Sequence, residues 1–413
     1  MRRPKRRPGS AVSVARHWRD AVLLGFLTVG AYGVSVYASG VLIEPVHDDT
    51  GWSVGWISAA FTVSGLAGGM GALGSGWLLD RIGARPVLLG SLLPGAALLL
   101  LASIARNALV FVVAWGLGGG LISAGLFYNI TMALTARLYP GDRVRAFAVL
   151  TFVGGFAAVI YFPLAGVLVD QFGWRTATRA LVVLMVAHVL PALAIRGGAA
   201  PAGAAATPLR GDLAGIGDAL RSRQVVLMIG MFSLAAMAFG AIQVHHVPAM
   251  TAAGVSLGTA TALASVRGFL SLPGRVLMEP AVRRTGVLGT LGGVYALMAI
   301  GSLPLAFGRG LGWLLVFTFS TGIAFGALSP LHGLRAAEVY GERRIGTLMG
   351  FQSLVVSLVS AMGPLLLGLT VDATGGYRLA ILLSCGLFAA ALALLLMARG
   401  QPAAGPEPSP AIS

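Results

Sequence analysis

The chain has 413 residues, of which 57 % are apolar and only 10 % are charged, and it carries a formal net charge of +15. A soluble protein has roughly 25 % charged residues, so this composition, with a mean hydropathy of +0.86, indicates a protein whose solvent is mostly lipid. The single cysteine, Cys385, excludes a disulfide framework and a cysteine-based metal cluster. The single lysine, Lys5, excludes a phosphate-binding P-loop. We therefore expect no enzyme, no cofactor and no metal site.

Apolar stretches of spanning length follow one another along the chain. The first is too long for the apolar core of a signal peptide, which has about 7–15 residues, whereas a bilayer crossing needs about 20. The alternating pattern of barrel strands is absent, so the spans are expected to be helices. The expected spans are 21–43, 54–79, 86–105, 109–136, 146–169, 176–195, 225–247, 256–280, 286–307, 311–334, 345–370 and 378–398. The predicted fold is an all-α membrane protein with twelve transmembrane helices.

Basic residues are divided very unequally between alternate connecting segments. With a cytoplasmic N-terminus, 22 of the 29 lysines and arginines fall on the cytoplasmic side and five on the other, which leaves Arg267 and Arg275 inside helices. Cytoplasmic loops of membrane proteins carry an excess of Lys and Arg. The charge therefore indicates topology in the cytoplasmic (inner) membrane, with both termini cytoplasmic, and does not indicate a nucleic-acid partner.

The chain consists of two similar halves. Segment 139–145 resembles 340–344 at an offset of 201 residues, and segment 163–175 resembles 364–378 at an offset of 202. Two six-helix halves form the repeat that is described for major facilitator transporters. The expected organisation is a basic cytoplasmic N-terminus (1–20), an N-terminal half (21–195), a cytoplasmic linker (196–224), a C-terminal half (225–398) and a cytoplasmic tail (399–413).

Short motifs support that interpretation. The sequence after the second span, GWLLDRIGARP (76–86), resembles the loop signature of the major facilitator superfamily, and EPAVRRTG (279–286) is its degenerate counterpart in the second half. The fragments GVLIEPV (40–46), FGWR (172–175) and HHVP (245–248) resemble the bacterial branch of monocarboxylate-transporter-like and oxalate–formate-antiporter-like proteins. The resemblance implies a fold that works by alternating access and a carboxylate as the substrate.

Two arginines lie within the predicted eighth span. A charged side chain at the bilayer centre costs at least about 2.5–3.5 kcal/mol. Arg267, Ser271, Arg275 and Glu279 are spaced by four and form one stripe of the helix. A guanidinium group matches a carboxylate bidentately, and the resemblance implies that Arg275 binds the substrate carboxylate, with Arg267 as a second candidate. The alternative is an ion pair between Arg275 and Glu279 that only stabilises the fold.

Further candidates are polar or titratable residues on other helices. Histidine titrates near pH 6.5, so His188, His245, His246 and His332 are candidates for proton coupling, unless each is only hydrogen-bonded within the bundle. The resemblance implies that helices one, four, seven and ten line the cavity. The substrate-binding candidates from these two considerations are Tyr32, Tyr128, Asn129, Gln243, His245, His246 and His332.

The loop signature supplies the gating candidates Asp80, Arg81 and Arg85, with Glu279 from its counterpart. Asp80 is expected to face the positive N-terminus of a helix across the interface between the halves. Such a contact would hold one conformation and be released in the other.

The sequence therefore predicts a monomeric secondary active transporter in the lipid bilayer, which moves a small organic anion, a monocarboxylate, by symport with a coupled proton. Ser271 stands where mammalian-type monocarboxylate transporters have an aspartate, and no lysine lies in a span, which speaks against a dicarboxylate clamp. An exporter of drug-like or amphipathic compounds and a vitamin permease of the same superfamily are alternatives. A non-transporting membrane sensor is a third possibility with little support, because the chain has no soluble signalling domain.

Overall fold

The protein is described from a computed structural model, which covers residues 18–195 and 210–399 in detail. Every regular element in these ranges is a helix. The expected N-terminal segment 1–20 and tail 399–413 lie almost entirely outside the described residues, as does 196–209 of the linker. The helices are α2 (Arg19–Tyr32), the π-helix η1 (Gly33–Tyr37), α3 (Ala38–Thr50), α4 (Val54–Ile82), α5 (Ala84–Ser103), α6 (Ala108–Leu126), α7 (Tyr128–Leu138), α8 (Arg143–Gly154), α9 (Phe156–Val186), α10 (Val189–Ala194), α11 (Arg210–Arg221), α12 (Arg223–Ala252), α13 (Leu257–Phe307), α14 (Leu311–Thr374) and α15 (Tyr377–Arg399).

Ten helical stretches among the described residues are long and apolar enough to cross a membrane. Two of them, Arg145–Ala194 and Leu257–Phe307, are about fifty residues long and are broken by glycines with non-helical backbone, Gly173 and Gly286. Each of these stretches therefore contains two crossings. The all-α membrane fold is confirmed, and the number of crossings is consistent with the expected twelve.

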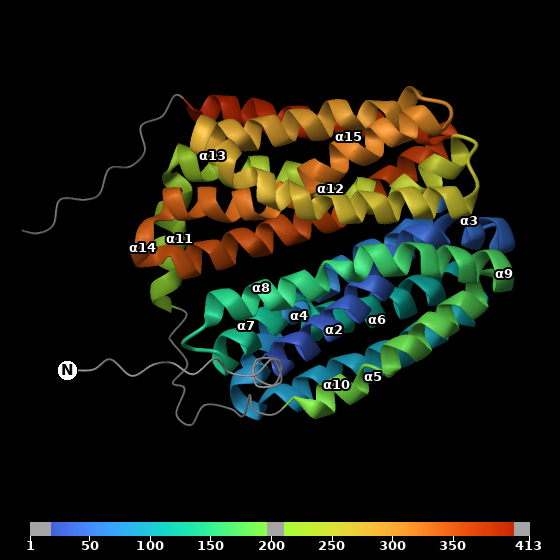
Figure 1. Ribbon diagram of the computed structural model, residues 1–413, viewed down its shortest axis with the longest axis horizontal. Coiled ribbons are helices and arrows are strands. Elements are labelled where there is room, and N and C mark those ends of the chain that lie inside the picture. Colours follow the sequence, from blue (N-terminus) through green and yellow to red (C-terminus); the bar gives the residue numbers. More distant parts are fainter. Residues whose placement is uncertain (1–17, 196–209, 400–413) are drawn as a thin grey trace, which may run out of the picture.

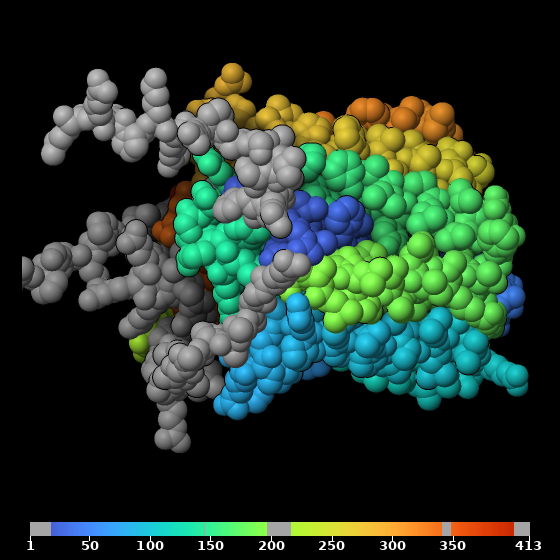
Figure 2. Space-filling view, turned by 60° about the horizontal axis from the view of Figure 1, so that its bottom comes forward, coloured from blue at the N-terminus to red at the C-terminus, as the bar shows by residue number. Residues whose placement is uncertain are grey.

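The two halves lie side by side, with the early helices α2–α10 on one side and α11–α15 on the other (Figure 1). Helix pairs from both halves join them, because α4 packs against α14, α3 and η1 against α12, and α9 against α13. The expected linker also contains a helix, α11, which contacts α12 and α14. Within the N-terminal half, α9 and α10 lie between α2 and α5 (Figure 2).

Glycines at the helix ends repeat between the halves. Gly51 and Gly254, and likewise Gly83 and Gly286, have positive φ and are separated by 203 residues. This backbone conformation is unfavourable for side chains with a Cβ, so each glycine ends one helix and turns the chain toward the next at matching places. Because the two offsets agree with those of the sequence fragments, the internal repeat extends to the backbone turns.

The first span is interrupted by a π-helical turn. The segment runs as α2, η1 and α3 without a break in helical direction, and the wide turn at Gly33–Tyr37 brings the ring of Tyr161 within 2.3 Å of the place where a Cβ on Gly33 would lie. π-turns inside α-helices are frequent at functional sites. Here the turn carries the buried Ser35 and ends at Tyr37.

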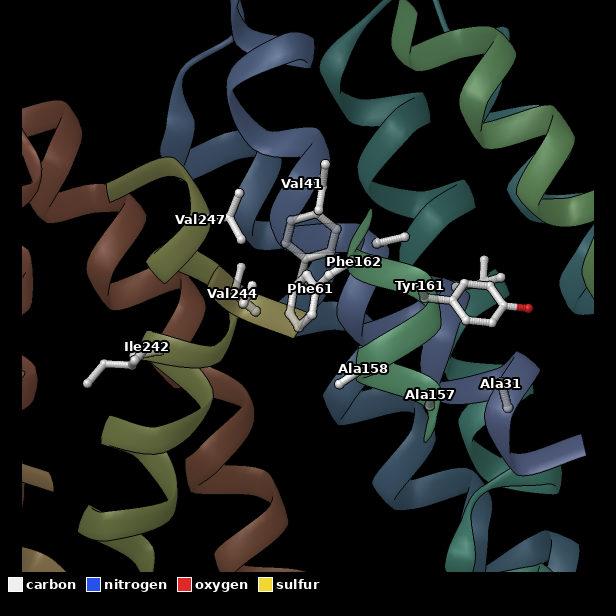
Figure 3. Packing of buried hydrophobic residues seen from close by; sticks show 14 of the residues in the cluster. Ala31, Val41, Phe61, Ala157, Ala158, Tyr161, Phe162, Ile242, Val244 and Val247 are labelled. Atoms are coloured by element: carbon white, nitrogen blue, oxygen red, sulfur yellow. The ribbon is translucent and has the colours of Figure 1, made fainter. Parts of the chain in front are cut away.

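The core and the outer surface are both apolar. Buried side chains of α3, α9 and α12, including Val41, Phe162, Val244 and Val247, meet between the halves (Figure 3). Large apolar side chains such as that of Val276 are exposed on the outside. An apolar exposed surface is the one a bilayer accommodates, so the burial pattern agrees with the membrane assignment.

Candidate substrate-binding site

A cavity of about 820 Å³ lies between the two halves. It extends from Tyr32 and Gln243 in the middle of the bundle to Asp80 and Arg137 at the ends of α4 and α7. We call the side of the molecule where α4 ends the Asp80 end, and the side where α14 ends the Asp372 end. The cavity therefore leads from the centre toward the Asp80 end.

Contacts between the halves close the Asp372 end. The Asp372 carboxylate accepts hydrogen bonds from the backbone N–H groups of Val54 (2.9 Å) and Gly55 (2.8 Å), the first residues of α4. Glu44 accepts a hydrogen bond from the Thr251 hydroxyl. These bonds join the N-terminal half to the C-terminal half beyond the inner limit of the cavity.

Arg267 is the most buried charge near the cavity, with only 2 % of its surface exposed. Its Nε donates to the Thr321 hydroxyl at 2.9 Å and its Nη1 to the Gln243 side-chain carbonyl at 3.0 Å, whereas its Nη2 has no partner. Both acceptors are neutral, and no carboxylate of the described residues forms an ion pair with it. A buried charge without a counter-ion is costly, so Arg267 is a cation that an anionic ligand would stabilise.

Aromatic rings surround this guanidinium group. Its carbon lies 5.6–5.9 Å from the ring centroids of Phe239, Phe317 and Phe325. The sequence analysis did not identify these rings, although Phe317, Thr321 and Phe325 are spaced by four and form one stripe of α14. That spacing, opposite an arginine in a neighbouring span, is the signal that could have found them.

Arg275 does not pair with Glu279 in this structure. Glu279 instead forms an exposed ion pair with Arg283 at 3.3 Å, one turn further along the helix. The Nε of Arg275 is buried and has no partner, and Arg275 is within electrostatic range of Tyr37 and Tyr128 in the other half. Among the described residues Arg275 is therefore a second cation without a carboxylate partner, but it does not line the cavity.

The polar candidates of helices one, four and seven divide into two groups. Tyr32, Asn129 and Gln243 line the cavity, and Tyr128 does not. Tyr32 stacks on Phe127 with ring centroids 3.9 Å apart. The N-terminal half thus contributes aromatic rings to the cavity wall, and the C-terminal half contributes Gln243, the partner of Arg267.

Of the histidines proposed to bind substrate, His245 and His246 are buried and His332 is partly buried, and none of the three lines the cavity. His245 Nε2 donates to the Pro364 carbonyl at 2.9 Å and contacts the Ser58 hydroxyl, and His246 Nδ1 donates to carbonyls of its own helix. His332 is hydrogen-bonded to the Tyr295 hydroxyl at 2.8 Å. In this conformation the bonds of His245 and His332 join different helices, whereas those of His246 stay within α12.

The gating candidates are also dispersed. Asp80 forms an ion pair with Arg137 of its own half. Among the residues whose side chains the structure describes, no helix N-terminus of the other half is bonded to Asp80. Arg81 lies over the Trp77 ring, and Arg85 donates to the backbone carbonyl of Ile195, the residue that follows α10.

Comparisons with known proteins agree with this architecture. The chain matches the family described as Major Facilitator Superfamily over residues 24–331 and again over 246–412. It is 26 % identical to human monocarboxylate transporter 11 over 376 residues, which cover 87 % of this chain and 78 % of that protein.

Two further matches are more distant in sequence or length. The 4-hydroxybenzoate transporter PcaK of Pseudomonas putida is 29 % identical over 185 residues, which cover 43 % of this chain and 38 % of that protein. The solved structure of the nucleoside transporter NupG has a TM-score of 0.78 at 13 % identity and covers 94 % of this chain and all of that one. At that identity the likeness concerns the fold alone.

Proposed function

The chain belongs to the major facilitator superfamily, and from that premise we propose that it carries a small organic anion, a monocarboxylate, across the membrane by alternating access. The observation that carries this proposal is Arg267, a buried cation with an unpartnered Nη2 directly behind the cavity-lining Gln243. A carboxylate at that nitrogen would supply the missing counter-charge. The name of human monocarboxylate transporter 11, which this chain resembles over most of its length, supports the same substrate class.

We also propose the orientation and the coupling. The Asp80 end, where most arginine-bearing loops lie, faces the cytoplasm according to the positive-inside rule. An impermeant thiol reagent should then label a cysteine at Asp49 from outside intact cells and one at Asp218 only after the membrane is opened. Symport with a proton predicts that an inward acid gradient speeds carboxylate uptake into proteoliposomes and that a protonophore removes the effect.

The substrate proposal is tested by binding and uptake with Arg267 variants. Hydrogen bonds to charged groups contribute about 1.5–3 kcal/mol, so Arg267→Gln should weaken carboxylate binding by roughly 10- to 150-fold. Arg267→Lys should fail nearly as badly, because an ammonium cannot donate to Thr321, Gln243 and the ligand in the same planar arrangement. The matched control is Arg378→Lys, which changes an exposed arginine over the Phe307 ring, away from the cavity; it should bind normally.

Stability separates this proposal from a structural role for Arg267. If the arginine serves the ligand, Arg267→Gln removes an uncompensated buried charge and should leave the melting temperature within a few degrees of wild type or raise it. Wild-type carboxylate uptake by well-folded Arg267→Gln would refute the anion site. Uptake of neutral or cationic amphipathic compounds, with no response to carboxylates, would support the drug-exporter alternative instead.

A further inference from the structure

Three buried polar atoms without hydrogen-bond partners belong to side chains in the cavity wall or directly behind it. They are Arg267 Nη2, Gln243 Nε2 and Ser35 Oγ, and the three residues are only 2 %, 4 % and 7 % exposed. Of the described residues that have a buried, unpartnered polar side-chain atom, Gln243 and Ser35 line the cavity. Arg267 lies behind them and is hydrogen-bonded to Gln243. Buried polar atoms are normally paired in native proteins, so these three mark where the polar atoms of a ligand would lie.

The two sides of the cavity offer different chemistry. Arg267 and Gln243, both in the C-terminal half, present two adjacent N–H donors and one positive charge, which match the two oxygens of a single carboxylate. Ser35, in the N-terminal half, presents one neutral hydroxyl that can both donate and accept. A ligand that satisfies all three atoms therefore has a carboxylate at one end and an uncharged hydrogen-bonding group at the other.

The π-helical turn explains why the Ser35 hydroxyl is unpartnered. A serine in a helix usually bonds to a carbonyl three or four residues earlier, and Ser39 does so, donating to the Val36 carbonyl at 2.6 Å. Ser35 lies within η1, where the backbone hydrogen bonds skip one residue further, and its hydroxyl makes no such bond. Two serines of the same cavity wall thus differ in whether their hydroxyl is available.

The cavity walls also carry aromatic rings. On one side Phe239 lines the cavity and stacks on Phe325, with centroids 4.8 Å apart at 29°. On the other side Tyr32 stacks on Phe127, and both line the cavity. Aromatic pairs gain more than their buried area alone provides, so a planar ring suits this space better than an aliphatic chain.

We infer that the substrate is an aromatic monocarboxylate whose ring bears a hydroxyl group opposite the carboxylate. The carboxylate binds Arg267 and Gln243, the ring lies between the walls of Phe239 and Tyr32, and the ring hydroxyl pairs with Ser35. This inference rests on the proposed function, because it assumes the anion site at Arg267.

Equilibrium binding to the purified full-length protein tests the inference with five probes: 4-hydroxybenzoate, 4-methylbenzoate, benzoate, cyclohexanecarboxylate and lactate. The expected order places 4-hydroxybenzoate about tenfold tighter than its isostere 4-methylbenzoate, because the methyl group leaves Ser35 unpaired. Benzoate should bind several-fold tighter than cyclohexanecarboxylate, and lactate should bind weakest.

Two serine variants locate the hydroxyl site. In Ser35→Ala the preference for 4-hydroxybenzoate over 4-methylbenzoate should fall to about one, whereas Ser39→Ala should keep it, since the Ser39 hydroxyl is already bonded to its own helix. If both variants lost the preference for 4-hydroxybenzoate equally, or if Ser35→Ala kept that preference, the assignment of Ser35 would be overturned. Cyclohexanecarboxylate or lactate binding as tightly as benzoate would overturn the aromatic inference and leave the proposed function intact. If none of the five binds, the proposed function itself fails.

Discussion

The two ends of the molecule differ in how the halves meet. At the Asp372 end, α4 is capped by a carboxylate of the other half, and Glu44 is bonded to Thr251 across the same interface. At the Asp80 end a cavity lies between the halves, and Asp80 pairs with Arg137 of its own half. A path that is closed at one end and open at the other is one state of an alternating-access cycle.

The helices α4 and α14 explain why an aspartate lies at each end. Val54 starts α4 where α14 reaches Asp372, so the last part of α14 runs antiparallel to α4, and each helix carries an aspartate near its C-terminus. A carboxylate is disfavoured by the negative end of its own helix and stabilised by the positive end of another. The Asp372 carboxylate is bonded to the N-terminus of α4, whereas the Asp80 carboxylate is paired with Arg137 of its own half.

The largest effect is expected from Gly40→Ala. A Cβ at Gly40 would lie 2.6 Å from the Val244 carbonyl oxygen, in the contact of α3 with α12. Such overpacking costs about 1–3 kcal/mol, which shifts the population toward opening of the Asp372 end by roughly 5- to 150-fold. A reporter cysteine at the buried Val247, in a protein with Cys385→Ser, should react faster with a thiol reagent.

The control for that variant is Gly90→Ala on α5, where a Cβ meets nothing within 4 Å. It should leave the Val247 reporter as unreactive as in the parent. Equal reactivity in both glycine variants would show that the α3–α12 contact does not keep the Asp372 end closed.

A smaller shift in the same direction is expected from Asp372→Asn. The variant keeps the shape of the side chain but loses the charge at the α4 N-terminus. That charge contributes about 0.5–2 kcal/mol to the stability of the closed Asp372 end. The cysteine at Val247 should therefore react about 2- to 30-fold faster. Asp170→Asn is the control, because Asp170 is the exposed counterpart of Asp372 in the first half. An unchanged reporter in Asp372→Asn would mean that the cap does not stabilise this state.

The sequence predicted the parts of the fold that have a local or periodic pattern. Hydropathy located the spans, and the offset of about 202 residues indicated the repeat that Gly51 and Gly254 show in the backbone. No local or periodic pattern in the sequence indicated that Asp372 caps α4, because Val54 and Asp372 are separated by 318 residues and an aspartate at a helix end is common. A contact of that kind follows only from the packing of the halves.

The candidate site was predicted in part. Tyr32, Asn129 and Gln243 line the cavity as expected, because polar residues in spans tend to face the interior. His245 and His246 do not line it, and one ring nitrogen of each is bonded to a backbone carbonyl, of Pro364 for His245 and of its own helix for His246. Residue type alone does not distinguish a histidine that faces a cavity from one that bonds between helices.

The smallest effect on affinity is expected from Asp80→Asn. The Asp80–Arg137 pair is about one-third to one-half exposed, and such pairs contribute about 0–1 kcal/mol, so carboxylate affinity should stay within a few-fold of wild type. If Asp80 has the gating role that the sequence predicts, transport should nevertheless slow, because its charge is lost. A tenfold loss of affinity with normal turnover would contradict this role, and Asp218→Asn, in the exposed pair with Arg221, should change neither quantity.

The most direct test is whether a carboxylate reaches Arg267 through the Asp80 end. A cysteine at Ala236, which lines the cavity, is introduced into the Cys385→Ser protein and probed with an impermeant maleimide in membrane vesicles of both orientations. The account predicts labelling mainly from the Asp80 side, slowed by an added carboxylate in the parent but not in Arg267→Gln. Labelling mainly from the Asp372 side, or carboxylate protection that persists in Arg267→Gln, would contradict it.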